Sequence, residues 1–297
     1  MLEIVNYNED EYQFPCLVVL GCFDGVHIGH AELLKKAKLQ AKINGLDLGV
    51  MVFAEGKGSK QIFTFEEKIE FLQQYNVKLI IKIDYNDEFK KTTPADFLKC
   101  LEDKINIKGY MSGKDFRFGA GAKGKSSTLK SYADDEDNSV WYMSVKDVVA
   151  GEDKVSCTRI KTLLEEGDVK SAAELLGRNY FVSGIVEHGA ERGANILGFP
   201  SLNIAYPENK VEIKQGVYSA VCAIDGEEFP AIVNYGARPT FDDDAVLLEA
   251  YLDGYSGDAY GKEVTVKFVD FIRDDIKFDS ADELKAQLEK DLEKIKQ

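Results

Sequence analysis

The sequence predicts an α/β domain built on a parallel sheet, followed by a mainly β domain that ends in a helix. The first half alternates apolar runs of strand length with segments of helical pattern, which is typical of a parallel sheet covered by helices. From about Tyr180 the pattern changes to short β-rich runs separated by Gly, Asp and Pro, as in an antiparallel barrel or sandwich. The length of 297 residues suits about two domains.

The first half contains three apolar runs that have the length and composition of buried strands. These runs are Leu17–Leu20, Leu48–Phe53 and Val77–Ile83. A helix whose apolar face carries Leu33, Leu34 and Ala37 is expected between the first two. This order of strand, helix and strand predicts neighbouring parallel strands.

Several helix starts are marked by capping signals. Thr64 and Glu67 have the spacing of a capping box, and Pro94 is a residue type favoured in a first helical turn. Two short helices are expected between the halves, at Thr158–Glu166 and Asp168–Gly177. Ser280 and Glu283 mark the start of a final helix with one apolar stripe, formed by Leu284, Leu288, Leu292 and Ile295.

The second half has four β-rich runs, Val217–Ile224, Ala231–Asn234, Leu247–Leu252 and Val264–Phe271. Asp225 and Gly226, between the first two, form a strong hairpin signal. We therefore expect an α/β domain over residues 1–155, a helical connector over 156–178 and a β domain over 179–297.

Composition and charge exclude several classes of protein. A net charge of −15 argues against nucleic acid as a main partner, because phosphate backbones require a basic face. No apolar run is long enough to span a membrane, and the N-terminus does not resemble a signal peptide. The five cysteines are scattered without CxxC spacing, which predicts neither a disulfide framework nor a cysteine-based metal site. A reducing cytoplasm is the expected location.

Two of the three histidines, His27 and His30, follow the exit of the strand Leu17–Leu20. A helix that begins there presents free N–H groups at the edge of the sheet where anions bind. Imidazoles three residues apart share one side of the helix and can donate hydrogen bonds to phosphate oxygens. Three glycines accompany them: Gly21, Gly25 and Gly29. A single histidine would more often be a packing residue, but this pair favours phosphate binding.

The segment GCFDGVHIGH, residues 21–30, resembles the signature G-x-F-D-G-x-H-x-G-H of bacterial bifunctional riboflavin kinase/FAD synthetases. The resemblance implies that His27 and His30 hold ATP phosphates during adenylyl transfer, in a Rossmann-like nucleotidyltransferase domain. It also implies nucleotide-binding roles for Gly21, Phe23, Asp24, Gly25 and Gly29.

Two further segments of the first half resemble motifs of the same family. Gly113–Gly119 is similar to G-x-D-F-R-F-G, which lines the nucleotide and flavin site and implies that Asp115 positions the nucleotide. Val155–Lys161 resembles I-S-S-T-x-I-R, which implies that the departing pyrophosphate is held by Ser156, Thr158 and Lys161.

The second half resembles the riboflavin kinase domain of this family, an antiparallel β-barrel. Gly198–Asn203 is similar to G-F-P-T-A-N, which implies ATP-binding roles for Gly198, Pro200, Ser201 and Asn203, the last two also toward Mg²⁺. Asn234 and Tyr260 are implied in flavin binding. Glu249 occupies the place of the catalytic glutamate, and phosphorylation of a hydroxyl indeed needs a carboxylate to accept its proton. Taken alone, Glu249 is equally compatible with a strand residue facing solvent.

The first half departs from the family pattern at three places. The segment Phe53–Gly58, FAEGKG, stands where the family carries a stretch like F-x-P-H-P. Lys161 replaces an arginine and loses its two-pronged contact with phosphate, and Cys157 replaces a serine. These departures leave open an alternative, a riboflavin kinase whose first domain binds nucleotide or flavin without efficient adenylyl transfer.

A phosphate-loop pattern, G-x-x-x-x-G-K-S, also occurs at Gly119–Ser126. A true phosphate loop follows a buried parallel strand, whereas the preceding residues 115–118 are too charged and too short to form one. The resemblance to the flavin family instead implies a mobile glycine-rich loop beside the active site.

The leading prediction is a two-domain flavin enzyme. The second domain would phosphorylate riboflavin to FMN with ATP, and the first would transfer AMP from ATP to FMN, which gives FAD and pyrophosphate. Mg²⁺ is expected for both steps because ATP is the donor. A third possibility is a nucleotidyltransferase for another phosphorylated small molecule, which would leave the motifs of the second half unexplained.

Overall fold

The structure is a computed structural model that describes residues 1–55, 60–187, 201–237, 246–278 and 280–295. Contacts within the chain divide it into two compact units, Met1–Cys157 and Thr158–Gln297, which are described separately. Among the described residues, none of the helices is long and apolar enough to cross a membrane.

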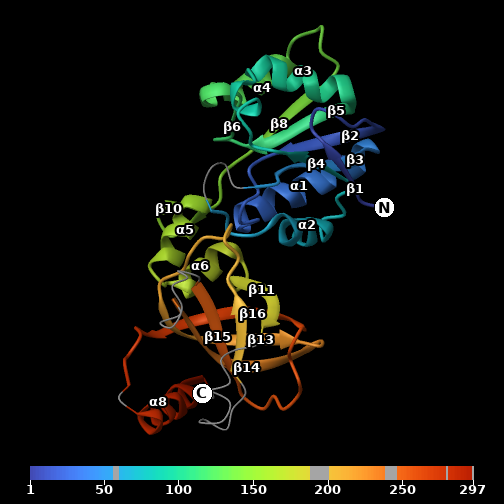
Figure 1. Cartoon of the computed structure of the whole chain (residues 1–297). Helices are drawn as coiled ribbons and strands as arrows, with labels where there is room; N and C mark the ends of the chain where they lie inside the picture. Colours follow the sequence, from blue (N-terminus) through green and yellow to red (C-terminus); the bar gives the residue numbers. More distant parts are fainter. Residues whose placement is uncertain (56–59, 188–200, 238–245, 279, 296–297) are drawn as a thin grey trace. The chain divides into compact units, whose positions relative to one another are not determined.

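The first unit is centred on a six-stranded sheet in which all neighbouring strands are parallel (Figure 1). In spatial order the strands are β1 (Glu3–Asn6), β4 (Leu79–Ile83), β3 (Asp47–Phe53), β2 (Tyr12–Leu20), β5 (Ile105–Gly113) and β8 (Trp141–Val145). The predicted α/β architecture is confirmed, although β1, β5 and β8 are additional to the strands expected from the sequence.

Helices cover both faces of this sheet. They are α1 (Ile28–Asn44), α2 (Phe65–Gln73), α3 (Pro94–Lys104) and α4 (Ser126–Ala133). Alternate residues of β2 enter different cores: Leu17 and Val19 pack with α1 and α2, whereas Val18 and Leu20 pack with α3 and α4. Thr64 and Glu67 form the predicted capping box of α2. The sheet is therefore buried on both faces, as parallel sheets require.

The order of the strands creates a switch point in the middle of the sheet. From β2 the chain proceeds through α1 and α2 toward β3 and β4 on one side, and later through α3 and α4 toward β5 and β8 on the other. The carboxyl ends of β2 and β5 are thus adjacent, which is the usual ligand-binding position in such sheets.

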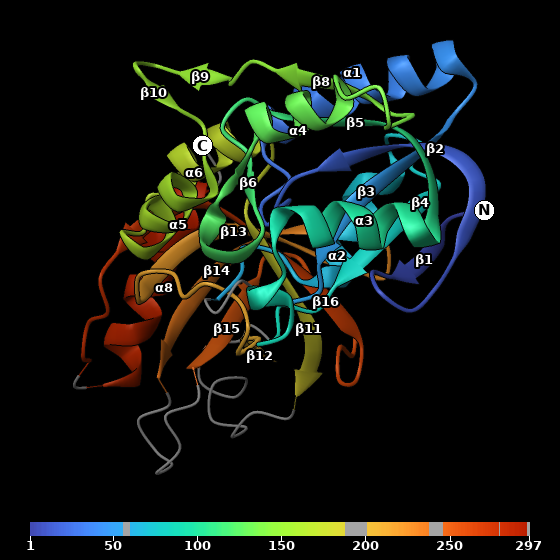
Figure 2. The same cartoon turned by 90° about the horizontal axis from the view of Figure 1, so that it is seen from above.

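Short elements lie between the main ones in the first unit. They are η1 (Phe89–Lys91), β6 (Arg117–Phe118), η2 (Ala120–Ala122), β7 (Gly124–Lys125), β9 (Val149–Ala150) and β10 (Asp153–Lys154). The β9–β10 ribbon extends beyond β8 at one side of the unit (Figure 2). These elements follow the carboxyl ends of β4, β5 and β8, so they surround the ligand-binding edge of the sheet.

The second unit contains a closed antiparallel barrel of six strands, which decides between the predicted barrel and sandwich in favour of the barrel. In order around the barrel the strands are β11 (Phe181–Glu187), β12 (Ser201–Ala205), β15 (Val246–Leu252), β14 (Glu227–Ala237), β13 (Gly216–Ile224) and β16 (Glu263–Arg273). The predicted hairpin turn joins β13 and β14, with positive φ angles of 52° at Asp225 and 84° at Gly226.

Three helices accompany the barrel strands within the described part of the second half. They are α5 (Cys157–Glu165), which begins at the last residue of the first unit, α6 (Val169–Leu176) and α8 (Ala281–Ile295). Leu288 and Leu292 of the predicted apolar stripe pack against Ile232 and Tyr251 of the barrel. Burial of this stripe attaches α8 to the outer face of the sheet.

A buried ion pair also fastens α8 to the barrel, and it gives a prediction for stability. Asp291 is fully buried and accepts a hydrogen bond of 2.9 Å from Arg273 Nε. Asp291→Ala should lower the free energy of unfolding by about 3–5 kcal/mol, because it leaves the arginine charge without its partner in a desolvated place. Chemical denaturation measures the effect. Glu289→Ala, at an exposed position of the same helix, should stay within about 0.5 kcal/mol.

Candidate functional site

The loop between β2 and α1 holds a strained backbone. Phe23 and Val26 have positive φ angles of 48° and 40°, a region that residues with side chains rarely adopt and that is least tolerated by β-branched valine. At Gly21 a Cβ atom would lie 2.7 Å from the Phe23 ring, so only glycine allows this ring to fold back over the loop. The packed loop directs its following residues, His27 and His30, to the carboxyl edge of the sheet.

His27 and His30 lie together at the start of α1. His27 is the N-cap, and its Nδ1 accepts a hydrogen bond of 3.3 Å from the His30 backbone N–H. The two rings stack with their centroids 3.8 Å apart and their planes at 14°, and Phe23 lies against the His30 ring. Gly29 permits this arrangement, because a Cβ there would approach the His27 ring to 3.1 Å. The structure therefore places both imidazoles on one side, as expected.

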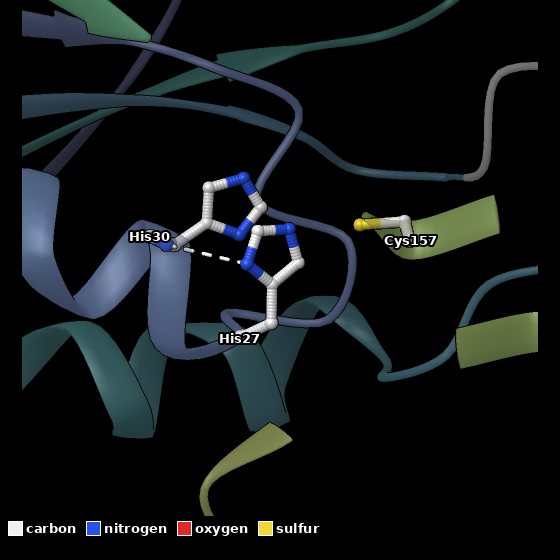
Figure 3. A group of neighbouring side chains, drawn as sticks. All are labelled: His27, His30 and Cys157. Atoms are coloured by element: carbon white, nitrogen blue, oxygen red, sulfur yellow. Dashed lines mark hydrogen bonds between the residues drawn. The ribbon is translucent and has the colours of Figure 1, made fainter. Parts of the chain in front are cut away.

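The cap determines which nitrogen of His27 can donate. Nδ1 uses its lone pair to accept the His30 N–H, so the neutral ring carries its proton on Nε2. The Cys157 sulfur points toward the two rings, and the ligand atoms of His27, His30 and Cys157 lie within 4.8 Å of one another (Figure 3). The group joins the first turn of α1 to the first residue of α5.

Asp24 connects the strained loop to the segment that follows β3. Its Oδ1 accepts a hydrogen bond of 2.9 Å from the Ile62 backbone N–H. Next to Ile62, the buried Gln61 accepts a hydrogen bond of 2.6 Å from the buried Lys68, whose Nζ also donates to the Phe53 carbonyl at 3.2 Å. Asp24 thus has a structural contact in addition to its predicted place in a nucleotide site. The adjoining residues 56–59, part of the FAEGKG departure, lie outside the described residues.

Asp115 lies just beyond the carboxyl end of β5 and is held by Lys154. Lys154 Nζ lies 2.8 Å from an oxygen of Asp115 and 2.8 Å from an oxygen of Asp147. The hydrogen bond from Lys154, followed by its positive charge, holds the pKa of the Asp115 carboxyl below its usual value. Asp115 is therefore an anchored carboxylate at the switch point of the sheet.

Removal of this lysine should release the Asp115 carboxyl. In Lys154→Met we expect the pKa of Asp115 to rise toward its ordinary value, because the hydrogen bond and charge that lower it are lost. The pKa of Asp115 is lower in the folded protein than in the unfolded chain. The ion pair therefore contributes fully to the stability of the fold at pH values above the unfolded-state pKa. This contribution is lost as the pH falls through the pKa of the folded protein. NMR titration of the side-chain carboxyl measures the shift. An unchanged Asp115 pKa in the variant would contradict this account.

An aromatic cavity of about 310 Å³ opens near the same edge of the sheet. Its walls come from the ends of β3 and β4 and from η1, α3 and the β6–β7 hairpin, and they consist mainly of Phe53, Tyr85, Phe89, Phe97, Phe116 and Phe118. Phe116 and Phe118 are stacked at 5.7 Å, and Lys90 and Arg117 add positive charge to the lining. Such a cavity suits a flat, partly apolar ring system that carries an anionic group.

The glycine-rich segment that follows this motif contains two short elements, η2 and β7. Gly119 has φ of 69°, and a Cβ there would lie 2.7 Å from the Pro94 nitrogen, which fixes the hairpin against the start of α3. A helix, α4, does begin at Ser126, but the strand before it, β6, has two residues and pairs antiparallel with β7. Gly119 is therefore not preceded by the buried parallel strand that a phosphate loop requires.

The other residues predicted to bind pyrophosphate belong to α5 and its start. Ser156 immediately precedes the helix and is half-buried, Thr158 is exposed, and Lys161 lies one turn after Cys157. Ser156 belongs to the first compact unit, and Thr158 and Lys161 to the second.

The barrel brings three predicted residues into one row. In the strand register Asn203 of β12 lies opposite Glu249 of β15, which in turn lies opposite Asn234 of β14. Directly opposed residues of antiparallel strands point to the same face, so the carboxylate has an amide on each side. Ser201 begins β12 two residues before Asn203, and Gly198 and Pro200 lie outside the described residues.

The row lies on the outer face of the barrel. Leu248 and Ala250 are fully buried, whereas Glu249 between them is half-buried and shares its face with Tyr251. Burial raises the pKa of the Tyr251 hydroxyl, and the Glu249 carboxylate raises it further through its charge and by accepting its hydrogen bond. The sequence pattern left open which face of the strand carries Glu249, and the structure places it on the outer face of the barrel.

Asn234 presents an atom that is available to a ligand. Its Oδ1 is buried, and no donor among the described residues reaches it. Buried polar atoms usually have a hydrogen-bond partner, which makes this oxygen a candidate for a contact with a ligand. Tyr260, the other predicted flavin contact, is 45% exposed, and the next residue, Gly261, donates its N–H to the Val186 carbonyl of β11.

Several residues of these sites were not predicted. The aromatic walls of the cavity outside the motif and the approach of Cys157 to the imidazoles join residues that are distant in sequence, whereas Tyr251 lies only two positions after Glu249 on β15. The available signals were the F-R-F alternation and the single aromatic residue two positions after Glu249.

Two protein-family models match different parts of the chain. The model of the family described as FAD synthetase matches residues 9–159, and that described as riboflavin kinase matches residues 176–297. The bifunctional riboflavin kinase/FMN adenylyltransferase of Bacillus subtilis (strain 168) is 32% identical over 293 residues, which cover 95% of this chain and 92% of that protein. The protein of the same name from Listeria monocytogenes is 32% identical over 93% of this chain and 90% of its own length.

One solved structure covers almost the whole chain. It is described as a macrolide-efflux protein from Streptococcus pneumoniae, and it has 30% sequence identity and a TM-score of 0.89, over 99% of this chain and 98% of that one.

Proposed function

Because this chain belongs to the family of bifunctional riboflavin kinase/FMN adenylyltransferases, we propose that it makes FMN from riboflavin and FAD from FMN. The barrel would transfer the terminal phosphate of ATP to the primary hydroxyl of riboflavin. The α/β unit would transfer AMP from a second ATP to FMN. Neither reaction requires a nucleic-acid or membrane partner.

The row Asn203–Glu249–Asn234 carries the kinase proposal. Glu249 is a half-buried carboxylate positioned to take the proton of the riboflavin hydroxyl as its oxygen attacks the terminal phosphorus and ADP leaves. Tyr251 lies on the same face of β15 as the carboxylate, two positions further along the strand. The amides on either side of Glu249 would bind the substrates, with the Asn234 Oδ1 as a flavin contact and Tyr260 at the edge of the site.

The barrel residues also fit the magnesium ion that accompanies ATP. Mg²⁺ prefers oxygen ligands and retains several waters, and Asn203 offers an amide oxygen beside the Glu249 carboxylate. We propose that Asn203 and Ser201 hold it together with the ATP phosphates; Gly198 and Pro200, which lie outside the described residues, remain predicted ATP-binding residues from the sequence. When bound, the ion neutralises charge on the transferring phosphoryl group.

The imidazole pair carries the adenylyltransferase proposal. His27 Nε2–H and the His30 ring are placed to donate hydrogen bonds to ATP phosphate oxygens as the FMN phosphate attacks the α-phosphorus and the bond to pyrophosphate breaks. The loop residues Gly21, Phe23, Asp24, Gly25 and Gly29 would shape this pocket, with Asp115 positioning the nucleotide. Ser156, Thr158 and Lys161 would hold the departing pyrophosphate. The aromatic cavity of about 310 Å³ would take the flavin ring of FMN.

Incubation of the pure protein with riboflavin, ATP and Mg²⁺, followed by chromatography of the flavins, tests both activities. We expect FMN to appear first and FAD to follow. FMN without FAD would support the alternative in which the α/β unit binds nucleotide or flavin without efficient transfer. No consumption of riboflavin would contradict the kinase assignment.

A further inference from the structure

The group formed by His27, His30 and Cys157 has the composition of a metal site. The ligand atoms of the three side chains lie within 4.8 Å of one another, with His27 buried and the other two half-buried. The sulfur points toward the imidazoles (Figure 3). We propose that these residues bind a divalent transition-metal ion of the zinc type, and that the bound ion blocks adenylyl transfer.

The ligand chemistry selects the class of ion. Two imidazoles and a thiolate favour Zn²⁺, Co²⁺ and related ions, whereas Mg²⁺ prefers carboxylate, phosphate and water oxygens. The site therefore discriminates against the ion that accompanies ATP. Three protein ligands leave a fourth position for water or a phosphate oxygen, as in open zinc sites.

A small movement is sufficient to close the site on an ion. Zinc–ligand distances of about 2.0–2.3 Å place the donors of a tetrahedral site roughly 3.3–3.8 Å apart. Because the three ligand atoms lie within 4.8 Å of one another, no pair must approach by more than about 1–1.5 Å. The His27 and His30 planes differ by 14°, so their in-plane lone pairs cannot both meet one ion until a ring turns. The χ2 torsion of histidine has a broad energy minimum, so this ring rotation is accessible.

Metal binding changes the protonation of the group. The Cys157 thiol gives up its proton to water as the sulfur–metal bond forms. His27 Nδ1 accepts the His30 N–H, so an ion on Nε2 requires the ring proton to move to Nδ1, which ends the cap hydrogen bond. The nitrogens whose lone pairs bind the metal can no longer donate hydrogen bonds to phosphate. This inhibitory consequence, unlike binding itself, rests on the proposed adenylyl transfer.

Titration of the full chain with Co²⁺, without ATP or flavin, tests the site directly. We expect a thiolate-to-cobalt charge-transfer band in the near ultraviolet and the visible bands of four-coordinate cobalt. Cys157→Ser should abolish the charge-transfer band. Cys100→Ser, at another half-buried cysteine of the same unit, should retain it. Absence of the band from the unmodified protein, or its persistence in Cys157→Ser, would overturn the proposal.

Inhibition by Zn²⁺ tests the consequence. FAD formation is measured from FMN, ATP and excess Mg²⁺, and each protein is compared with itself without zinc. Loss of a residue that hydrogen-bonds to a metal ligand typically weakens metal affinity by roughly 10–100-fold, and loss of a ligand itself should weaken it at least as much. Cys157→Ser should therefore need at least about tenfold more zinc for half inhibition. Equal zinc sensitivity of the two proteins would contradict the inhibitory role. If no FAD forms even without zinc, the adenylyltransferase proposal fails, while the cobalt titration still decides the metal site.

Discussion

Glu249→Gln should reduce phosphorylation of riboflavin by about 10²–10⁴-fold, the usual contribution of a positioned general base. The substitution keeps the size of the side chain and its place between Asn203 and Asn234, but removes the group that accepts the hydroxyl proton. The initial rate of FMN formation from riboflavin, ATP and Mg²⁺ measures the effect. Because proton transfer accompanies chemistry, the loss should appear in kcat more than in KM.

Two controls separate this role from a general effect on the barrel. Glu263→Gln changes an exposed glutamate on β16 of the same barrel and should leave the rate of FMN formation close to that of the unmodified protein. FAD formation from added FMN should be preserved in Glu249→Gln, because Glu249 takes no part in the proposed adenylyl chemistry. An undiminished kcat for riboflavin would exclude Glu249 as the base.

Local signals in the sequence predicted much of the fold. The Thr64–Glu67 capping box, the Asp225–Gly226 turn and the buried runs of β2, β3 and β4 depend on neighbouring residues alone, and each appears in the structure. Strand β5 was not predicted, because Asn106 and Lys108 interrupt its apolar residues. Its burial depends on the flanking strands and on α3 and α4, which no local pattern reports.

The candidate sites could be predicted only in part, for the same reason. The spacing of His27 and His30 indicated a shared side, and the stacked rings confirm it. The proximity of Cys157, 127 residues beyond His30, requires the complete sheet. Likewise the row Asn203–Glu249–Asn234 depends on the register between strands, which the alternation of apolar and polar residues in one strand does not specify. A shift of one residue would move every side chain of a strand to the opposite face. Valine rarely adopts a positive φ angle, so the sequence gives no indication that Val26 does so.

His27→Asn should lower adenylyl transfer from ATP to FMN by about 10²–10³-fold, comparable with the loss of one preorganised donor to a developing oxyanion. Asparagine is among the favoured N-cap residues, so its side-chain oxygen can accept the His30 N–H in place of Nδ1 and preserve the start of α1. It has no group that reaches the position of Nε2. The rate of FAD formation, with FMN supplied, measures the loss, and FMN formation by the same variant serves as the internal control.

The comparison with His27→Ala separates the two functions of this side chain. Alanine removes both the cap and the donor, so it should destabilise the first unit by about 1 kcal/mol while losing no more activity than His27→Asn. If His27 served only to cap the helix, His27→Asn would retain its rate and only His27→Ala would be impaired. If the donor matters, both variants lose transfer equally and differ only in the denaturation midpoint. Because the cap occupies Nδ1, any catalytic contribution of His27 must come from Nε2, and this pair of substitutions isolates that nitrogen.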